Sequence, residues 1–152
     1  MLAPLHFRLA DPSDVATLHD IRQEAIRRLT PTHLPECEAA AWAKSGGIPR
    51  VERAIARDEV WVAMFGPHVV GWLHRSGNSI EGLYVLPAAA RQGVGAALVR
   101  LAENQAARGG HQFVVLGSSS NALEFYRRLG YVTAGRQSAS GAIPMRKPIE
   151  TT

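Results

Sequence analysis

Residues 80–98 join a β-rich run directly to a helical run through a loop that contains two glycines. The run IEGLYVLP is followed at once by AAARQGVGAAL, so Gly93 and Gly95 fall where the helix begins. Glycine lets the backbone approach a ligand closely, and the unpaired N–H groups of a helix's first turn attract an anion. The pattern therefore predicts a loop that binds a phosphate group. A lone Gly-x-Gly also fits an ordinary turn, which stays the alternative for this segment taken alone.

Two common classes of phosphate site fit this loop poorly. A nucleotide-triphosphate loop needs a lysine directly after its last glycine, whereas the first lysine after Gly95 is Lys147. A dinucleotide fold needs a small residue three positions after the second glycine and an acidic residue at the end of the next strand. Leu98 occupies the first position, and the next β-rich run ends at Leu116 without an acidic residue. The sequence therefore excludes the triphosphate loop and disfavours NAD or FAD.

The hydrophobic spacing along the chain predicts a mixed α/β fold. Apolar residues recur every three or four positions in five segments, which predict helices, and β-rich runs bounded by turn residues predict seven strands. The helices are expected at residues 12–29, with Asp11 as the N-cap of the first, and at residues 36–44, 49–57, 94–108 and 122–129. The strands are expected at residues 5–10, 60–65, 69–74, 80–86, 113–116, 131–134 and 143–147.

Composition limits the classes of protein to which the chain can belong. With 152 residues, 46% hydrophobic and 20% charged, it suits a single domain over residues 1–152. Apolar runs such as residues 94–99 fall far short of the roughly 20 residues of a membrane span, so we expect a cytoplasmic protein with no membrane partner. The charge of +4 comes from scattered arginines, which disfavours nucleic acid. Cys37 is the only cysteine, and no Cys/His spacing predicts a metal site.

Two motifs in order carry a family resemblance. LYVLP followed by RQGVGAALV, and then SSSNALEFYRRLGYV, resemble the acyl-CoA-binding core of the GNAT superfamily of N-acetyltransferases over residues 80–132. The resemblance implies a mixed, mostly antiparallel central sheet of about six or seven strands flanked by helices. It also implies a splay between the strands at residues 80–86 and 112–117, and acetyl-CoA as co-substrate.

The resemblance also implies which residues hold the cofactor. Backbone N–H groups at residues 83–85 would bind the pantetheine and the thioester carbonyl, and those at residues 92–96 would bind the pyrophosphate. Ala90 stands where the family usually has Arg or Gln, which should reduce affinity modestly. Ser119 and Asn121 would either contact pantetheine or cap the following helix. The implied cofactor residues are Leu83, Tyr84, Val85, Arg91, Gln92, Gly93, Val94, Gly95, Ala96, Ser119, Asn121 and Tyr126.

A thioester is already activated, so a positioned neutral amine attacks it directly, without a covalent enzyme intermediate. The N–H of Val85 is the candidate for stabilising the developing oxyanion. Tyr126 stands at the position where the family's tyrosine faces the sulfur, with a core tyrosine packed beside Phe125 as the alternative. Glu81 is the candidate base for the incoming ammonium, with a solvated strand carboxylate as the alternative.

The acceptor is not identified by the sequence. Trp42, and Trp61 or Trp72, are candidate aromatic walls of its site, although such residues are usually core. His74 and His111 fit structural roles better than catalytic ones. The leading function is an acetyl-CoA-dependent N-acetyltransferase acting on a primary amine of a small molecule or peptide. The rival is a noncatalytic acyl-CoA-binding sensor or interaction domain, and the sequence leaves open whether the chain forms a homodimer.

Overall fold

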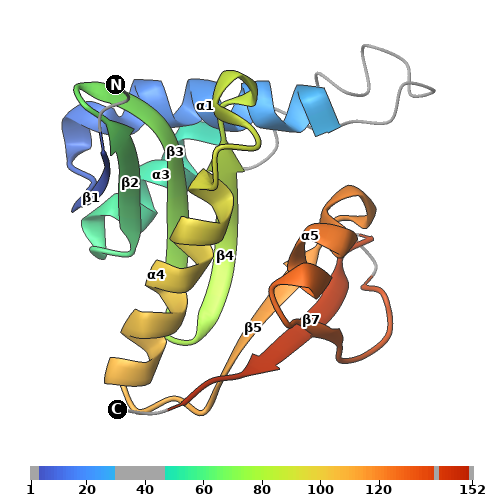
Figure 1. Ribbon diagram of the computed structural model, residues 1–152. Helices are drawn as coiled ribbons and strands as arrows, with labels where there is room; N and C mark the ends of the chain where they lie inside the picture. The colour runs from blue at the N-terminus through green and yellow to red at the C-terminus, as the bar shows by residue number, and fades with distance from the viewer. Residues whose placement is uncertain (1–3, 30–46, 139–140, 151–152) are drawn as a thin grey trace. The chain divides into compact units, whose positions relative to one another are not determined.

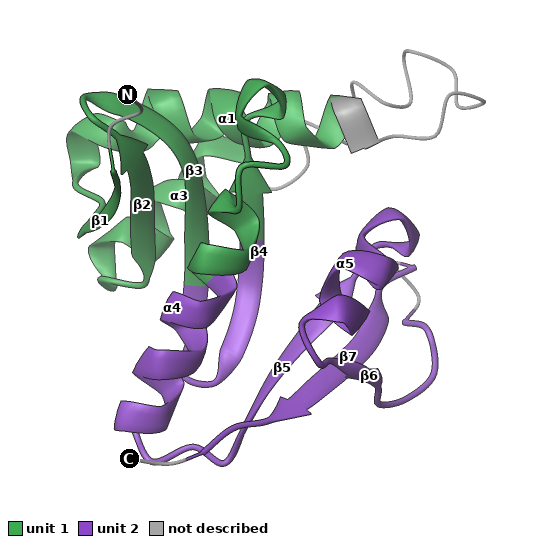
Figure 2. Cartoon of the chain, in the orientation of Figure 1, with its two compact units in different colours: residues 1–74, 83–98 green, residues 75–82, 99–152 purple. Residues whose placement is uncertain are grey.

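The computed structural model describes residues 4–29, 47–138 and 141–150. The chain forms two compact units: unit 1 is residues 1–74 and 83–98, and unit 2 is residues 75–82 and 99–152 (Figure 2). The boundary falls inside strand β4 (Ser79–Val85) and inside helix α4 (Val94–Arg108). The single domain expected over residues 1–152 stays a prediction.

The described residues contain a seven-stranded sheet and four helices (Figure 1). The strand order is β1-β2-β3-β4-β5-β7-β6. Pairing is antiparallel in β1/β2, β2/β3, β5/β7 and β6/β7, and parallel in β4/β5. The predicted mixed α/β fold with a mostly antiparallel sheet is therefore confirmed. Besides β4 and α4, the elements are β1 (Leu5–Leu9), α1 (Val15–Leu29), α3 (Gly47–Ala56), β2 (Val60–Phe65), β3 (His68–Ser76), β5 (Phe113–Ser118), α5 (Leu123–Arg128), β6 (Val132–Thr133) and β7 (Ile143–Pro148).

In unit 1, helices cover both faces of the strands. Trp72 on β3 is buried with residues of α1, α3 and β2, and its indole N–H donates to the Leu18 carbonyl at 2.9 Å. The preceding residue, Gly71, lies against Val94 and Leu98 of α4. Successive strand residues point to opposite faces, so α1 and α3 pack on one face and the first half of α4 packs on the other.

In unit 2, β5 lies between β4 and β7. Parallel pairing joins Ser79 to Val115 and Ile80 to Leu116, and β7 pairs antiparallel along the whole of β5 (Figure 1). The splay expected between residues 80–86 and 112–117 involves residues of both units and stays a prediction.

Several element boundaries differ from the predicted ones for local reasons. The strand expected at residues 131–134 is only Val132–Thr133, because the Tyr131 N–H donates to the Tyr126 carbonyl at 3.1 Å and closes α5 instead. A 3₁₀ turn at residues 12–14 precedes α1. The helix expected at residues 36–44 lies outside the described residues, as do Cys37 and Trp42.

A reciprocal cap starts the first helical segment. The Asp11 carboxylate accepts from the Ser13 N–H at 2.7 Å, and Asp14 Oδ2 accepts from the Asp11 N–H at 2.8 Å. Arg8 donates to both oxygens of Asp14, at 2.7 and 2.8 Å. These bonds satisfy N–H groups that a helix start otherwise leaves unpaired, and they tie β1 to the segment that leads into α1.

We expect Asp14→Asn to lower the free energy of unfolding by about 1–2 kcal/mol at pH 7, a range reduced for the partial exposure of Arg8. The Arg8 hydrogen bonds hold the pKa of Asp14 below its usual value, against an opposing effect of burial. The stabilisation is therefore complete above the unfolded pKa near 4 and is lost as pH falls through the lower folded pKa. Urea unfolding at pH 7 and at pH 2–3 would measure this. Asp20→Asn, at an exposed position of α1, is the control, and an equal loss at both pH values would contradict the assignment.

Candidate functional site

The end of β4 in unit 1 is held close to β3 by a glycine. A Cβ atom at Gly71 would lie only 2.8 Å from the Tyr84 carbonyl oxygen, closer than real Cβ contacts, so only glycine fits there. The Leu86 N–H donates to the Val70 carbonyl at 2.8 Å. Because neighbouring N–H groups of an extended strand point to opposite edges, the Val85 N–H points away from β3. This is the orientation that a donor to a ligand on the other edge of β4 needs.

The loop after β4 has the backbone conformation of an anion-binding turn. Arg91 and Gly93 have positive φ angles of 64° and 80°. The Gly93 carbonyl accepts from the Ala97 N–H at 3.0 Å, which makes Gly93 the N-cap of α4. The N–H groups of Val94, Gly95 and Ala96 therefore belong to the first turn, where a helix provides no partner of its own.

The surroundings of this turn also suit a phosphate. Arg91, Gln92 and Gly93 are exposed, whereas Val94 is 1% exposed and anchors the helix start in the core. The first turn of α4 carries no acidic side chain, so nothing there opposes the positive end of the helix dipole. Ala90 is exposed in extended conformation, and Arg91 next to it supplies the nearest cation along the chain.

Gly71 also brings the strand end and the loop together. A Cβ atom added at Gly71 would lie 3.3 Å from Val94 Cγ1 and 2.8 Å from the Tyr84 carbonyl oxygen. Residues 83–85 and 91–96, predicted to hold the pantetheine and the pyrophosphate, thus lie within one unit and around one glycine. Sequence reasoning did not single out Gly71, although a glycine inside a β-rich run is a signal of a close approach by another backbone segment.

An aromatic and cationic cluster lies on the opposite face of β4. The Tyr84 ring is 4.8 Å from Trp72 between centroids, and the Arg22 guanidinium carbon is 5.8 Å from the Tyr84 centroid. Trp72 is a core residue here, so its interpretation as an acceptor wall is disfavoured. Arg22 on α1 is buried, although charged side chains mostly lie in solvent. Its spacing from Leu18 and Ala25, four and three residues, is the signal that placed it on the apolar face of α1.

Unit 2 contains the other predicted site residues. Tyr126 on α5 is buried, with its ring at the edge of Phe125 at 5.0 Å and of Tyr131 at 5.8 Å. This packing is what a core tyrosine would show. It also holds the ring in one orientation, which a donor to the cofactor sulfur would need. The catalytic role of Tyr126 stays a prediction.

Glu81, Ser119 and Asn121 also lie in unit 2. Glu81 and Asn121 are exposed. Ser119 is the N-cap of the 3₁₀ turn at residues 120–122 but makes no side-chain cap hydrogen bond, so the capping alternative is not observed for Ser119. His74 Nε2 lies 2.9 Å from Glu59 Oε1, which fits the structural role expected of it.

The described residues hold no cluster of three His, Cys, Asp or Glu side chains suited to a metal ion. Within the same residues, none of the helices has both the length and the apolar character needed to cross a membrane.

Comparison with known proteins identifies the family. The model of the family described as "Acetyltransferase (GNAT) domain" matches residues 19–147. The chain belongs to the GNAT acetyltransferases. The chain is also similar to the uncharacterized N-acetyltransferase YafP of Escherichia coli, with 27% identity over 134 residues, which are 88% of this chain and 85% of YafP.

Solved GNAT structures share the fold over nearly the whole chain. A GCN5-related N-acetyltransferase from Rhodopseudomonas palustris superposes with a TM-score of 0.87 at 24% identity, covering 98% of each chain. The PaiA N-acetyltransferase from Thermoplasma acidophilum, solved in complex with coenzyme A, gives 0.82 at 18% identity over 95% of this chain and 99% of its own. Family membership confirms the predicted enzyme class, an acetyltransferase with acetyl-CoA as co-substrate.

Proposed function

We propose that the protein transfers the acetyl group of acetyl-CoA to a primary amine of a small molecule or peptide, by direct attack within a ternary complex. The observation that carries this proposal is the juxtaposition, around Gly71, of the β4 end with the N-terminus of α4. A CoA-type donor needs one surface for its thioester and a second, anion-binding surface for its pyrophosphate. The positive φ of Gly93 and the free first-turn amides supply the second.

Three sets of residues bind the cofactor in this proposal. The backbone at residues 83–85 holds pantetheine and the thioester carbonyl, and the amides of residues 92–96 hold the pyrophosphate, with the Arg91 side chain beside them. Ser119 and Asn121 contact pantetheine. Because most of these contacts are backbone N–H groups, the alanine at position 90 reduces affinity only modestly.

The chemistry requires a polarised carbonyl and help for the departing thiolate. The Val85 N–H, which points away from β3, donates to the oxyanion as the amine attacks. Tyr126 donates to the sulfur as the C–S bond breaks. Full proton transfer from a tyrosine of pKa about 10 to a thiolate whose thiol has a pKa of about 8.5 costs roughly 2 kcal/mol, so the hydroxyl acts mainly as a hydrogen-bond donor.

One experiment tests the activity and identifies the acceptor. Purified protein is incubated with acetyl-CoA and panels of small amines, amino acids, polyamines and peptides, and thiol release is measured. A strongly preferred amine, with its N-acetyl product found by mass spectrometry, is the expected result. Binding of acetyl-CoA without release above the enzyme-free rate for every panel would favour the second candidate, a noncatalytic acyl-CoA sensor. Ala90, at the position where the family usually has Arg or Gln, is the observation that favours this second candidate.

Glu81 is the proposed base for the acceptor ammonium, because it stands on β4 two residues before the cofactor-binding stretch and its side chain is exposed to solvent. We expect Glu81→Gln to lower the rate most at low pH, where the acceptor is protonated and needs the base. The pH–rate profile with the preferred amine checks this. A variant whose profile matches that of the wild type would return Glu81 to a solvated carboxylate.

A further inference from the structure

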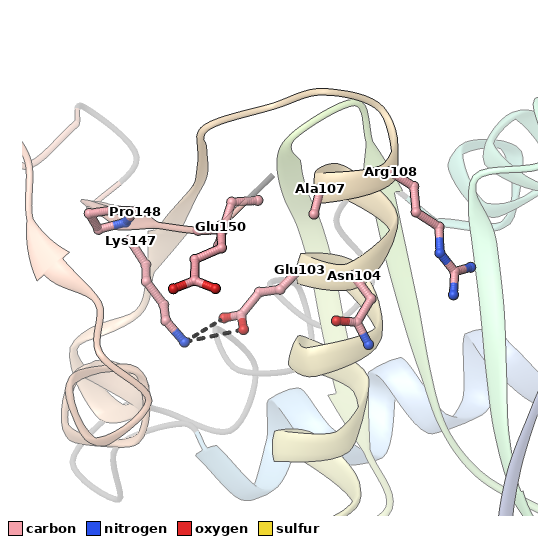
Figure 3. A pocket seen from close by; sticks show the side chains of 8 residues that line it. Glu103, Asn104, Ala107, Arg108, Lys147, Pro148 and Glu150 are labelled. Atoms are coloured by element: carbon pink, nitrogen blue, oxygen red, sulfur yellow. Dashed lines mark hydrogen bonds and ion pairs between the residues drawn. The ribbon is translucent and has the colours of Figure 1, made fainter. Parts of the chain in front are cut away.

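Three side chains from separate segments of unit 2 form one partly buried polar network. The Tyr131 hydroxyl donates to Glu103 Oε2 at 2.8 Å, and Lys147 Nζ donates to both Glu103 oxygens at 3.1 Å. Tyr131 follows α5, Glu103 lies on α4 and Lys147 lies on β7. Figure 3 shows the Lys147 and Glu103 side chains directed toward each other. The network therefore joins two helical segments and a strand that are distant in sequence.

The Tyr131 hydroxyl keeps its proton in this network. Tyr131 is 1% exposed, and burial, followed by the Glu103 hydrogen bond, raises its pKa far above the ordinary value. Its hydroxyl thus remains a donor under working conditions. The Glu103 carboxylate is compensated by Lys147, whose ammonium also lies 5.8 Å from the Tyr131 ring centroid. A partly buried carboxylate that accepts from both a cation and a hydroxyl donor in this way is held in place.

Tyr131 also holds Tyr126, from two directions. Its ring meets the Tyr126 ring at 5.8 Å with an interplanar angle of 72°, and its N–H donates to the Tyr126 carbonyl at 3.1 Å. Between them, Gly130 takes a φ of 100° and lies against the Lys147 side chain. A Cβ atom added at Gly130 would lie 3.2 Å from Lys147 Cε. The C-terminal end of the six-residue helix α5 is therefore anchored through Tyr131 to Glu103 and Lys147.

We propose that Tyr131 is a positioning residue that fixes the orientation of the Tyr126 ring through its hydrogen bond to Glu103. The proposal rests on the proposed role of Tyr126 at the departing sulfur. Tyr131 itself is not the donor to the cofactor, because its hydroxyl is committed to Glu103. The Tyr126 ring gains orientation from its edge contact with the Tyr131 ring, so loosening Tyr131 loosens Tyr126.

Removing the Tyr131 hydroxyl should not unfold the protein. Glu103 keeps both Lys147 contacts, and together they line an open cavity of about 600 Å³ that also includes Asn104 and Glu150 (Figure 3). Water in this cavity can replace the lost donor, because the site is polar and large enough. Tyr131→Phe is therefore a clean substitution: it keeps the ring and removes one hydrogen bond.

The first test needs no acceptor. The chain has three tyrosines, so protein labelled with ¹³C at Cζ of tyrosine gives three resolvable signals, assigned by single Tyr→Phe variants. Coenzyme A is titrated into the wild type and into Tyr131→Phe. The wild-type Tyr126 signal should shift on binding, and in Tyr131→Phe that shift should fall by about half or more, with the coenzyme A affinity changed less than about twofold.

The second test is kinetic and uses the preferred amine of the acceptor screen. Tyr131→Phe should lower kcat about 3- to 10-fold at unchanged KM for acetyl-CoA, and should change kcat less than about twofold when Tyr126 is already phenylalanine. Glu124→Gln is the control, because it removes an exposed ion pair of the same helix, with Arg127 at 2.9 Å, and should leave both readouts unchanged.

The outcomes separate the two proposals. If coenzyme A does not shift the wild-type Tyr126 signal and Tyr126→Phe keeps full activity, Tyr126 does not act on the departing sulfur. The positioning role of Tyr131 is then overturned as well. If Tyr126 responds but Tyr131→Phe leaves the shift intact, or lowers kcat equally in both backgrounds, Tyr131 is merely structural and only the present inference is overturned.

Discussion

Replacing Gly93 with valine is expected to weaken coenzyme A binding by roughly 100-fold, because it strains the loop and displaces amides that face the pyrophosphate. Gly93 has a φ of 80°, a conformation that costs an L-residue about 1–2 kcal/mol and a β-branched one more. Relaxing that strain turns the N-cap of α4 and moves the first-turn N–H groups. Each charge-assisted bond lost there is worth about 1.5–3 kcal/mol. Titration calorimetry with coenzyme A measures the change.

The same helix offers a matched control. Gly110 has a φ of 85°, and, like Gly93, its Cβ position has no heavy atom within 4 Å. It follows the C-terminal end of α4, where the dipole repels anions. Gly110→Val should therefore cost similar stability and leave coenzyme A affinity unchanged. Equal affinity in the wild type and both variants, with melting temperatures recorded for each, would refute the pyrophosphate loop.

Local signals predicted most of the fold. β2 was expected at residues 60–65 and is Val60–Phe65. Its ends could be predicted because the β-rich run is bounded by Arg57-Asp58-Glu59 on one side and Gly66-Pro67 on the other. The helix start at Val94 followed from Gly93 before it and from the spacing of the apolar residues after it. The strand expected at 131–134 was too long, since the Tyr131 N–H had a partner in α5 that no local pattern reveals.

The same distinction between local and long-range signals applies to the candidate site. The loop at residues 91–96 could be predicted because glycine spacing encodes its conformation. The Tyr131–Glu103–Lys147 network could not, since its bonds join residues 28 and 44 positions apart, and Tyr, Glu and Lys are individually ordinary. Arg22 is an intermediate case: its helical spacing with Leu18 placed it on the buried face, but its charge argued for solvent.

Tyr126→Phe is expected to lower kcat about 10- to 100-fold, which corresponds to about 1.5–3 kcal/mol for one transition-state hydrogen bond. The proposed hydroxyl bond forms as negative charge develops on the sulfur, so it strengthens in the transition state and contributes little to ground-state affinity. Coenzyme A binding should therefore hardly change.

The substitution keeps the part of Tyr126 that packs. The ring contacts with Phe125 and Tyr131 are those of a phenyl group, so the melting temperature should stay near that of the wild type. Arg127→Gln on the same helix is the control, because the exposed Arg127–Glu124 pair contributes little to stability. Thiol release with the preferred amine, coenzyme A affinity and melting temperature are measured for each variant. A fall in kcat alone assigns the hydroxyl to the departing thiolate, whereas a fully active Tyr126→Phe makes Tyr126 a core residue of α5 and leaves the thiolate to solvent or to another donor.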